Sequence, residues 1–166
     1  MPKIVIIANN LRSTHNIGSL FRTADGLGIN KIYLTGYTPY PMVLNDQRLP
    51  HISKKIDLAI AKTALGAHKT VPFEHHDNIT TLIKQLKLDN YKIIALEQTK
   101  NSLNIINYQP PKKIALLIGR EVEGIEPELL ELADDIIVIP MLGKKESFNV
   151  VQATAIALYH LKYAPF

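Results

Sequence analysis

Short runs of aliphatic residues recur along this chain and restrict the folds that are open to it. The runs span residues 3–8, 31–35, 70–73, 91–96, 113–118 and 136–139. Most are nearly continuous in Ile, Val, Leu and Ala, which is typical of strands buried on both faces of a sheet. Segments with apolar residues at helical spacing lie between them. The alternation predicts an α/β fold, a mostly parallel sheet with helices on both faces.

Helices and one irregular segment are predicted between the strands. They span residues 16–28, 57–65, 79–88, a segment opening at Pro127, and a long segment from about Asn149 onward. The intervening residues 36–53 carry three prolines and show no period, so we predict one long irregular segment, a kind that is often functional. The length of 166 residues suits one domain. Without an internal repeat or linker, residues 1–166 are expected to form that single domain.

Composition excludes several classes of protein. The chain has no cysteine, which rules out disulfides and thiolate chemistry. No apolar run approaches the roughly 20 residues of a membrane span, and the apolar start at residues 3–8 is too short for a signal peptide. We therefore expect a soluble, cytoplasmic protein without a membrane partner. A formal charge of +4 is compatible with a polyanionic partner but does not require one.

The last helix is apolar around almost its whole circumference. Few of its positions are clearly polar, namely Gln152, Thr154 and His160. A helix of this kind must be buried on all sides, and a single sheet covers only one of them. We therefore expect the other side to meet a second copy of the chain in a two-fold dimer.

The loop before that helix is the first candidate site. Pro140 ends a predicted strand, and Ser147 and Asn149 stand two residues apart at the start of the helix. Ligands of α/β proteins bind at such strand-to-helix loops, where a helix offers unpaired N–H groups. Capping of the helix by either side chain is the simpler alternative for this loop.

Two further stretches carry polar residues at similar places. In the first, His15, Gly18, Ser19 and Arg22 share one helical face, and a helical glycine costs about 1 kcal/mol relative to alanine, which suggests a close approach there. Capping by Asn16 and an exposed pair of Arg22 with Asp25 are the alternatives. In the second, Gly119 and Glu121 follow a strand, and the alternative is a plain turn.

Together, in this order and spacing, the three stretches resemble the three motifs of the SpoU-type RNA 2′-O-ribose methyltransferases, a branch of the SPOUT superfamily. The matching residues are Asn16 and Arg22 in the first motif, Gly119, Glu121 and Gly124 in the second, and Pro140, Ser147 and Asn149 in the third. The resemblance spans nearly the whole chain and implies a minimal stand-alone member. Val122 and Glu126 depart from the family pattern and put the local turn in doubt.

The resemblance implies a fold, a cofactor and an assembly. The carboxyl-terminal part of the sheet would form a deep trefoil knot, and its loops would bind S-adenosylmethionine. The implied cofactor-binding residues are Leu96, Gly119, Ile139, Ser147 and Phe148. The family acts as a homodimer with the final helix at its interface, which agrees with the apolar character of that helix.

The resemblance also implies methyl transfer to a ribose 2′-hydroxyl and names the residues for it. The implied catalytic residues are Arg22, Asn16, Glu121, Ser147 and Asn149. Because a guanidinium hardly ever gives up a proton in proteins, we expect Arg22 to stabilise the developing alkoxide or a neighbouring phosphate. The other four would orient Arg22 and the ribose. No metal is needed for this chemistry.

RNA would be the partner, and the absence of extensions favours tRNA over rRNA as the substrate. Tyrosines can stack on bases and cations can contact phosphate. The candidate RNA contacts are Tyr37, Tyr40, Arg48, His51, Lys54, Lys55, Lys144 and Lys145, with ordinary solvated surface as the alternative for each.

Other functions fit the sequence less well. A nucleotide-dependent oxidoreductase needs a glycine fingerprint that Gly26-Leu27-Gly28 does not supply, and Gly143-Lys144 lacks the other residues of a phosphate loop. The cluster from Glu74 to Asp77 holds adjacent histidines that would point apart, so a solvated surface is expected there instead of a metal site. A non-catalytic RNA-binding protein that keeps the fold remains the alternative from a different class.

Overall fold

The computed structural model describes residues 1–164 and contains one seven-stranded sheet. Its strands are β1 (Lys3–Asn9), β2 (Lys31–Thr35), β3 (Phe73–His76), β4 (Lys92–Leu96), β5 (Leu103–Asn104), β6 (Lys113–Ile118) and β7 (Asp135–Val138). They lie in the order β3-β2-β1-β6-β4-β7-β5, and every neighbouring pair is parallel. The predicted parallel sheet is therefore confirmed.

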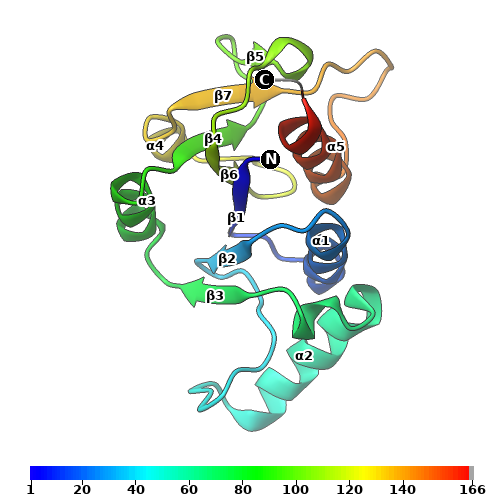
Figure 1. The fold of residues 1–166 in the computed structure, drawn as a ribbon. Helices are drawn as coiled ribbons and strands as arrows, with labels where there is room; N and C mark the ends of the chain where they lie inside the picture. The colour runs from blue at the N-terminus through cyan, green and yellow to red at the C-terminus, as the bar shows by residue number, and fades with distance from the viewer. Residues whose placement is uncertain (165–166) are drawn as a thin grey trace.

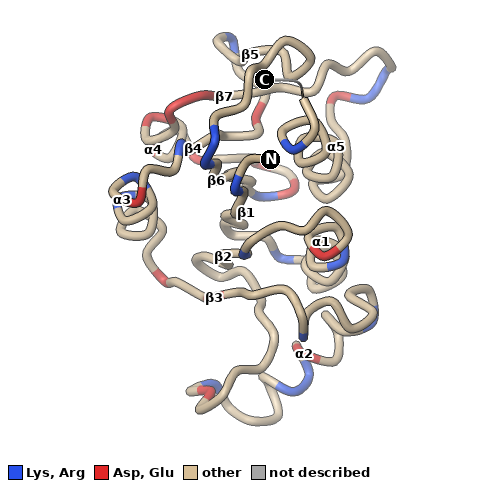
Figure 2. Tube along the Cα trace, viewed as in Figure 1, with Lys and Arg blue, Asp and Glu red and all other residues tan. Residues whose placement is uncertain are grey.

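Helices cover both faces of the sheet, as Figure 1 shows. They are α1 (Thr14–Gly26), α2 (Pro50–Ala64), α3 (Ile79–Leu88), α4 (Pro127–Leu130) and α5 (Val150–Tyr163), with short 3₁₀ turns η1 (Ala67–Lys69) and η2 (Ile105–Asn107). Helices α1, α2 and α5 share one hydrophobic cluster with the sheet, and α3 and α4 share the other. Basic and acidic residues are mixed over the surface (Figure 2).

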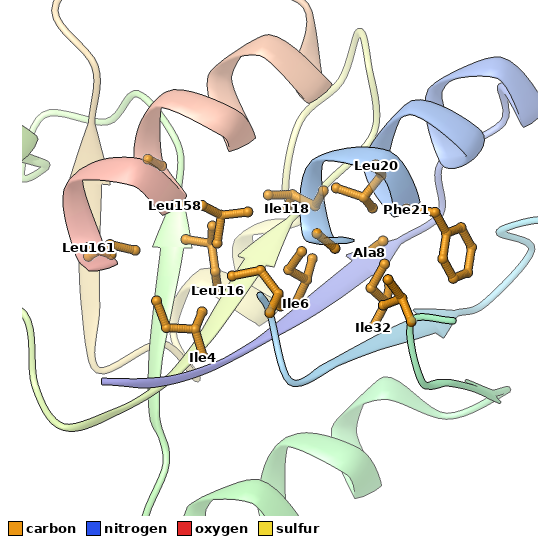
Figure 3. Close-up of a cluster of buried hydrophobic side chains, with 14 of the residues drawn as sticks. Ile4, Ile6, Ala8, Leu20, Phe21, Ile32, Leu116, Ile118, Leu158 and Leu161 are labelled. Atoms are coloured by element: carbon orange, nitrogen blue, oxygen red, sulfur yellow. The ribbon is translucent and has the colours of Figure 1, made fainter. Parts of the chain in front are cut away.

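The larger core lies between the sheet and the helices α1 and α5. Alternate residues of β1 point to opposite faces, so Ile4 and Ile6 enter this core whereas Val5 and Ile7 enter the other one. Figure 3 shows side chains from β1, β2 and β6 meeting those of α1 and α5. These side chains are almost completely buried, which explains why the strands are apolar on both faces.

Several predicted boundaries are wrong. Helix α2 begins at Pro50, seven residues before the predicted start, so the irregular segment ends at Leu49. The third strand spans 73–76, whereas residues 70–73 were expected, and β5 was not predicted. Both β3 and β5 lie at the edges of the sheet. There, partial exposure weakens the apolar signal of a strand.

The strand order brings the ends of four strands together. Ala8 of β1 is level with Ile118 of β6, Ala95 of β4 with Leu117 of β6, and Leu96 of β4 with Ile137 of β7. The loops after β1, β6, β4 and β7 therefore leave the same edge of the sheet side by side. This edge is where α/β sheets bind ligands.

Helix α5 is buried on one side only. Val151, Leu158 and Leu161 pack into the core, whereas Tyr159 and Tyr163 are exposed and contact each other with ring centroids 4.9 Å apart. Thr154, expected to be a polar position of the helix, is fully buried, and its hydroxyl is satisfied by donating to the Val150 carbonyl at 2.6 Å. None of the helices in the described part of the chain has the length and apolarity to cross a membrane.

Candidate functional site

A cleft opens at the carboxyl ends of β4, β6 and β7. It encloses a cavity of about 180 Å³ that is partly open to solvent. The lining residues come from the loops after the three strands and from the start of α5. They include all five predicted cofactor-binding residues, Leu96, Gly119, Ile139, Ser147 and Phe148. Three segments far apart in the sequence thus meet at one cavity.

The glycines of the second motif are required by the turn itself. A Cβ on Gly119 would lie 2.7 Å from the Gly124 carbonyl oxygen and from the Ile125 side chain. Gly124 has a φ of +72° and would place a Cβ against the Glu97 carboxylate, which accepts the Ile125 amide at 2.9 Å. Both glycines therefore let residues 119–125 fold tightly beside the cleft.

Glu121 joins the second motif to the first. Its Oε1 accepts hydrogen bonds from the Ser13 amide and the Asn16 side-chain amide, both at 3.3 Å. Its Oε2 accepts the Arg12 amide at 3.4 Å. Partial burial raises the pKa of Glu121, but the hydrogen bonds to the carboxylate outweigh this effect, so its pKa is lowered overall. The side chain is thus held as a carboxylate at the start of α1.

Asn16 and Asn149 complete this cluster. Ser13, rather than Asn16, caps α1, since its hydroxyl oxygen accepts the Asn16 amide at 3.2 Å. The Asn16 side chain is therefore available to donate to Glu121 and to accept from Asn149 Nδ2 at 3.4 Å. Asn149 also caps α5 by accepting the Val151 amide at 2.9 Å. Asn149 therefore caps its helix, which was the simpler alternative, and also contacts Asn16 of the first motif.

Arg22 lies apart from the other predicted catalytic residues. It is exposed on α1 and lines a separate hollow against α2 with Ser19 and Thr63. The alternative, an ion pair between Arg22 and Asp25, is not among the ion pairs formed by the described residues. Within one chain, the structure groups Asn16, Glu121 and Asn149 and places Ser147 in the cleft, but it leaves Arg22 outside.

We expected Gly18 to share a helical face with Arg22. Gly18 is instead buried against α2. A Cβ there would lie 2.9 Å from the Ala64 amide nitrogen and closer still to the Ile60 carbonyl oxygen and the Thr63 hydroxyl. The close approach that this glycine suggested is therefore the packing of α2 on α1.

A second polar cluster beside the cleft was missed. Glu126 accepts the side-chain amides of Asn9 and Asn10 at 3.1 Å each, and its Oε1 lies 3.7 Å from the Nε of Arg120. Asn9 is 2% exposed. Arg120 and Glu97 directly follow Gly119 and Leu96 and line the cleft. The rule that ligands bind at the ends of parallel strands would have found them.

Two of the predicted RNA contacts, Tyr40 and Arg48, already contact each other and neighbouring residues of the protein. The Arg48 guanidinium donates to the Asp46 carboxylate and to the Tyr40 and Pro41 carbonyls. It also lies 3.6 Å from the centre of the Tyr40 ring, whose other partner is the His75 ring at 4.2 Å. These contacts fold the segment before α2.

The remaining predicted contacts are more accessible. Tyr37 is 51% exposed, with the Arg12 guanidinium 5.7 Å from its ring centre. His51, Lys54, Lys55, Lys144 and Lys145 are also exposed. No group of three potential metal ligands occurs among the described residues, and the side chain of His76, one of the adjacent histidines, contacts Glu74.

Comparisons with known proteins agree with this geometry. Residues 3–159 match the sequence pattern of the SpoU rRNA Methylase family. The tRNA (guanosine(18)-2′-O)-methyltransferase of Aquifex aeolicus is 33% identical over 156 residues, which is 94% of this chain and 67% of that protein. Other curated relatives are covered over 58% to 73% of their length.

Solved structures show the same fold. The crystal structure of the A. aeolicus TrmH/SpoU tRNA modifying enzyme has a TM-score of 0.79 and 29% identity, covering 98% of this chain and 75% of that one. The AdoMet-bound rRNA methyltransferase from Sinorhizobium meliloti also gives 0.79, at 23% identity, covering 96% of this chain and 55% of that one. The chain therefore belongs to the SpoU methylase family.

Proposed function

We propose that the protein transfers a methyl group from S-adenosylmethionine to a ribose 2′-hydroxyl of RNA, with tRNA as the favoured substrate. The observation that carries this is the meeting of three motifs at one edge of the sheet, where Glu121 holds Asn16 and both lie next to the cleft. Family membership and the A. aeolicus relative named as a tRNA methyltransferase support it.

The cleft fits this cofactor. Leu96, Ile118, Ile139 and Phe148 give it apolar walls suited to an adenine ring, and glutamates line its polar part. The chemistry supplied by S-adenosylmethionine is an electrophilic methyl group on a positively charged sulfur. Backbone groups of the segments around Leu96, Gly119 and Ile139 would hold it, together with Ser147 and Phe148.

The residues of the chain act on the acceptor. The 2′-hydroxyl oxygen forms a bond to the methyl carbon as the carbon–sulfur bond breaks, and the hydroxyl proton is released to solvent. A guanidinium stabilises the negative charge that develops on this oxygen, which is the role we assign to Arg22. Asn16, Glu121, Ser147 and Asn149 orient the ribose and keep the acceptor in line with the cleft.

This assignment requires a homodimer, because Arg22 lies outside the cleft of its own chain. Ile156, Tyr159 and Tyr163 leave an exposed apolar face on α5, and such a face suits a two-fold interface. We propose that α5 forms the interface and that Arg22 of one copy serves the cleft of the other.

Mixed dimers test this proposal. Mixing equal amounts of an Arg22→Ala variant and a cleft variant, Glu121→Ala, makes half of the dimers mixed. If Arg22 acts across the interface, each mixed dimer has one complete site, so activity recovers to about a quarter of the wild-type value. If Arg22 acts in its own chain, no complete site forms and activity stays at the level of the inactive parents.

The proposal also covers the domain organisation, the knot and the cellular location. Residues 1–166 would form one methyltransferase domain whose carboxyl-terminal part is tied in a trefoil knot. The position of β6 and β7 on opposite sides of β4, with α5 returning to α1, supports the knot. We also propose a cytoplasmic location, where the RNA substrates are made.

RNA would approach along the exposed loops beside the cleft. Tyr37 with Arg12 offers a ring and a cation next to the start of α1, which suits an unpaired base and its phosphate. The tip of the loop between β7 and α5 is basic (blue in Figure 2) and carries Lys144 and Lys145. Arg48 and Tyr40 would instead keep the loop before α2 in shape.

Two measurements test the function. Calorimetry with S-adenosylmethionine should show binding, and labelled methyl transfer to tRNA and rRNA transcripts should favour tRNA. Binding without transfer to any RNA would indicate a non-catalytic RNA-binding protein, and transfer to rRNA alone would shift the substrate. Arg22→Ala should abolish transfer while leaving cofactor affinity nearly intact.

Mapping the ribose methylations lost in a deletion strain would identify the nucleotide.

A further inference from the structure

The charges of the cleft are unequal. Three glutamates line it, Glu97, Glu121 and Glu146, whereas Arg120 is the only cationic residue among the described lining residues. Carboxylates attract positive groups such as a sulfonium or an ammonium. A single arginine among them is suited to the opposite task of holding a negative group.

The guanidinium of Arg120 has N–H groups that are not used in hydrogen bonds within residues 1–164 of the protein. Its nearest acidic atoms are Glu126 Oε1 at 3.7 Å and Glu123 Oε2 at 3.9 Å from Nε, and neither separation is a hydrogen bond. The Nε atom is buried and has no hydrogen-bond partner. Both oxygens of Glu126 already accept from Asn9 and Asn10. The nearby acids therefore keep Arg120 in place by charge without using its hydrogen bonds.

The methyl donor carries one negative group. S-adenosylmethionine has a sulfonium, an ammonium and an α-carboxylate, so the two cations suit the glutamates and the carboxylate needs a donor. The planar fork of an arginine binds a carboxylate through two parallel hydrogen bonds. We propose that Arg120 binds the α-carboxylate of the methyl donor. This inference rests on the proposed function, because it assumes that the cleft holds that donor.

The role separates two ligands that share the adenosine and the thioether. S-adenosylhomocysteine keeps the amino-acid group with its carboxylate, whereas 5′-methylthioadenosine keeps the adenosine and the thioether but lacks that group. Arg120 should therefore matter for the first ligand and not for the second. A residue that only shapes the cleft would affect both.

The experiment is calorimetry on the full chain with both ligands. Arg120→Gln should weaken binding of S-adenosylhomocysteine by about ten-fold or more, as expected for a lost charge-assisted pair, and change binding of 5′-methylthioadenosine by less than about two-fold. Lys100→Gln removes the same charge from an exposed residue near the cleft that does not line it. This control should change neither affinity.

Each other result has a definite meaning. Equal loss of both ligands, or no loss of either with a raised KM for RNA, would overturn the role and leave the proposed function standing. A wild-type chain that binds neither ligand would overturn the proposed function itself. If Arg120→Gln fails to fold, Arg120→Lys serves instead. It keeps the charge but loses the fork, so a smaller loss confined to S-adenosylhomocysteine is expected, and an unchanged affinity counts against the inference.

Discussion

Replacing Gly18 by alanine sets two effects of known size against each other. Gly18 lies within α1, where alanine is favoured over glycine by about 0.8–1.0 kcal/mol. Its position against α2 opposes this gain, because the added Cβ would overlap the Ile60 carbonyl, the Thr63 hydroxyl and the Ala64 amide. Two of these three groups belong to the backbone of α2 and cannot rotate away. Thr63 is also fixed, since its hydroxyl donates to the His15 carbonyl at 2.8 Å.

The net effect should be destabilising. Overpacking typically costs about 1–3 kcal/mol, and the contact here demands that α2 as a whole move away from α1. Because the opposing groups are mainly backbone atoms, the cost belongs in the upper part of that range, about 2–3 kcal/mol. Subtracting the helix-propensity gain of about 1 kcal/mol leaves an expected loss of about 1–2 kcal/mol. For a chain of this size, about 2–4 °C of melting temperature corresponds to 1 kcal/mol, so Tm should fall by about 2–8 °C. Methyl transfer should fall too, because α1 carries Asn16 and Arg22.

The matched control lies at the end of the same helix. A Cβ on Gly26 would meet no atom within 4 Å, and its φ is not positive. Gly26→Ala should therefore raise stability by about 0.5–1 kcal/mol. Urea unfolding and thermal melting of both variants measure the difference. A Gly18→Ala variant as stable as the Gly26→Ala variant would show that α1 and α2 are not packed as closely as described.

Three further predictions follow from other contacts. Lys162→Met removes a donor to the carbonyls of Leu27 and Gly28 at the end of α1. The free energy of unfolding, measured by urea titration, should therefore fall by about 1 kcal/mol. An unchanged value would contradict the contact. The lowered pKa of Glu121 stabilises the fold above its unfolded pKa of about 4.3, an effect lost as pH falls through the lower folded value. The destabilisation caused by Glu121→Gln should thus be smaller at about pH 3 than at neutral pH. The Arg48 guanidinium holds the pKa of Asp46 well below its usual range, so in an Arg48→Ala variant an NMR titration should show that pKa rising toward about 3.9. The backbone amides of residues 43 and 48 still donate to this carboxylate and keep its pKa below that value; an unchanged pKa would refute the pairing with the guanidinium.

The parallel fold and most of the cleft were predictable from local patterns. Buried strands of a parallel sheet are apolar on both faces, so the runs ending at Leu96 and Ile118 stood out without any structure. The residues after such runs lie at the ligand-binding edge whatever the strand order. The residues themselves, Gly119 and Ile139 with Ser147 and Phe148, were named from the family resemblance, and all four line the cleft.

The beginning of α2 and the roles of single polar residues were less accessible. Residues 50–56 have only two isoleucines and one proline as apolar residues, so helical periodicity is weak where α2 starts. Ser13 and Asn16 are both good caps, and the sequence does not show which of them faces a carboxylate from a loop more than a hundred residues away.

The fold class was predictable from short-range periodicity, and the motifs and the cleft residues from the family resemblance, because motifs are recognised by residue types at fixed spacing. Three features became visible only in the packed molecule: β6 lies between β1 and β4, Glu126 holds Asn9 and Asn10 beside Arg120, and Arg22 lies apart from the other catalytic candidates. Strand order and the pairing of distant side chains depend on how whole elements pack, and local patterns carry no record of that packing.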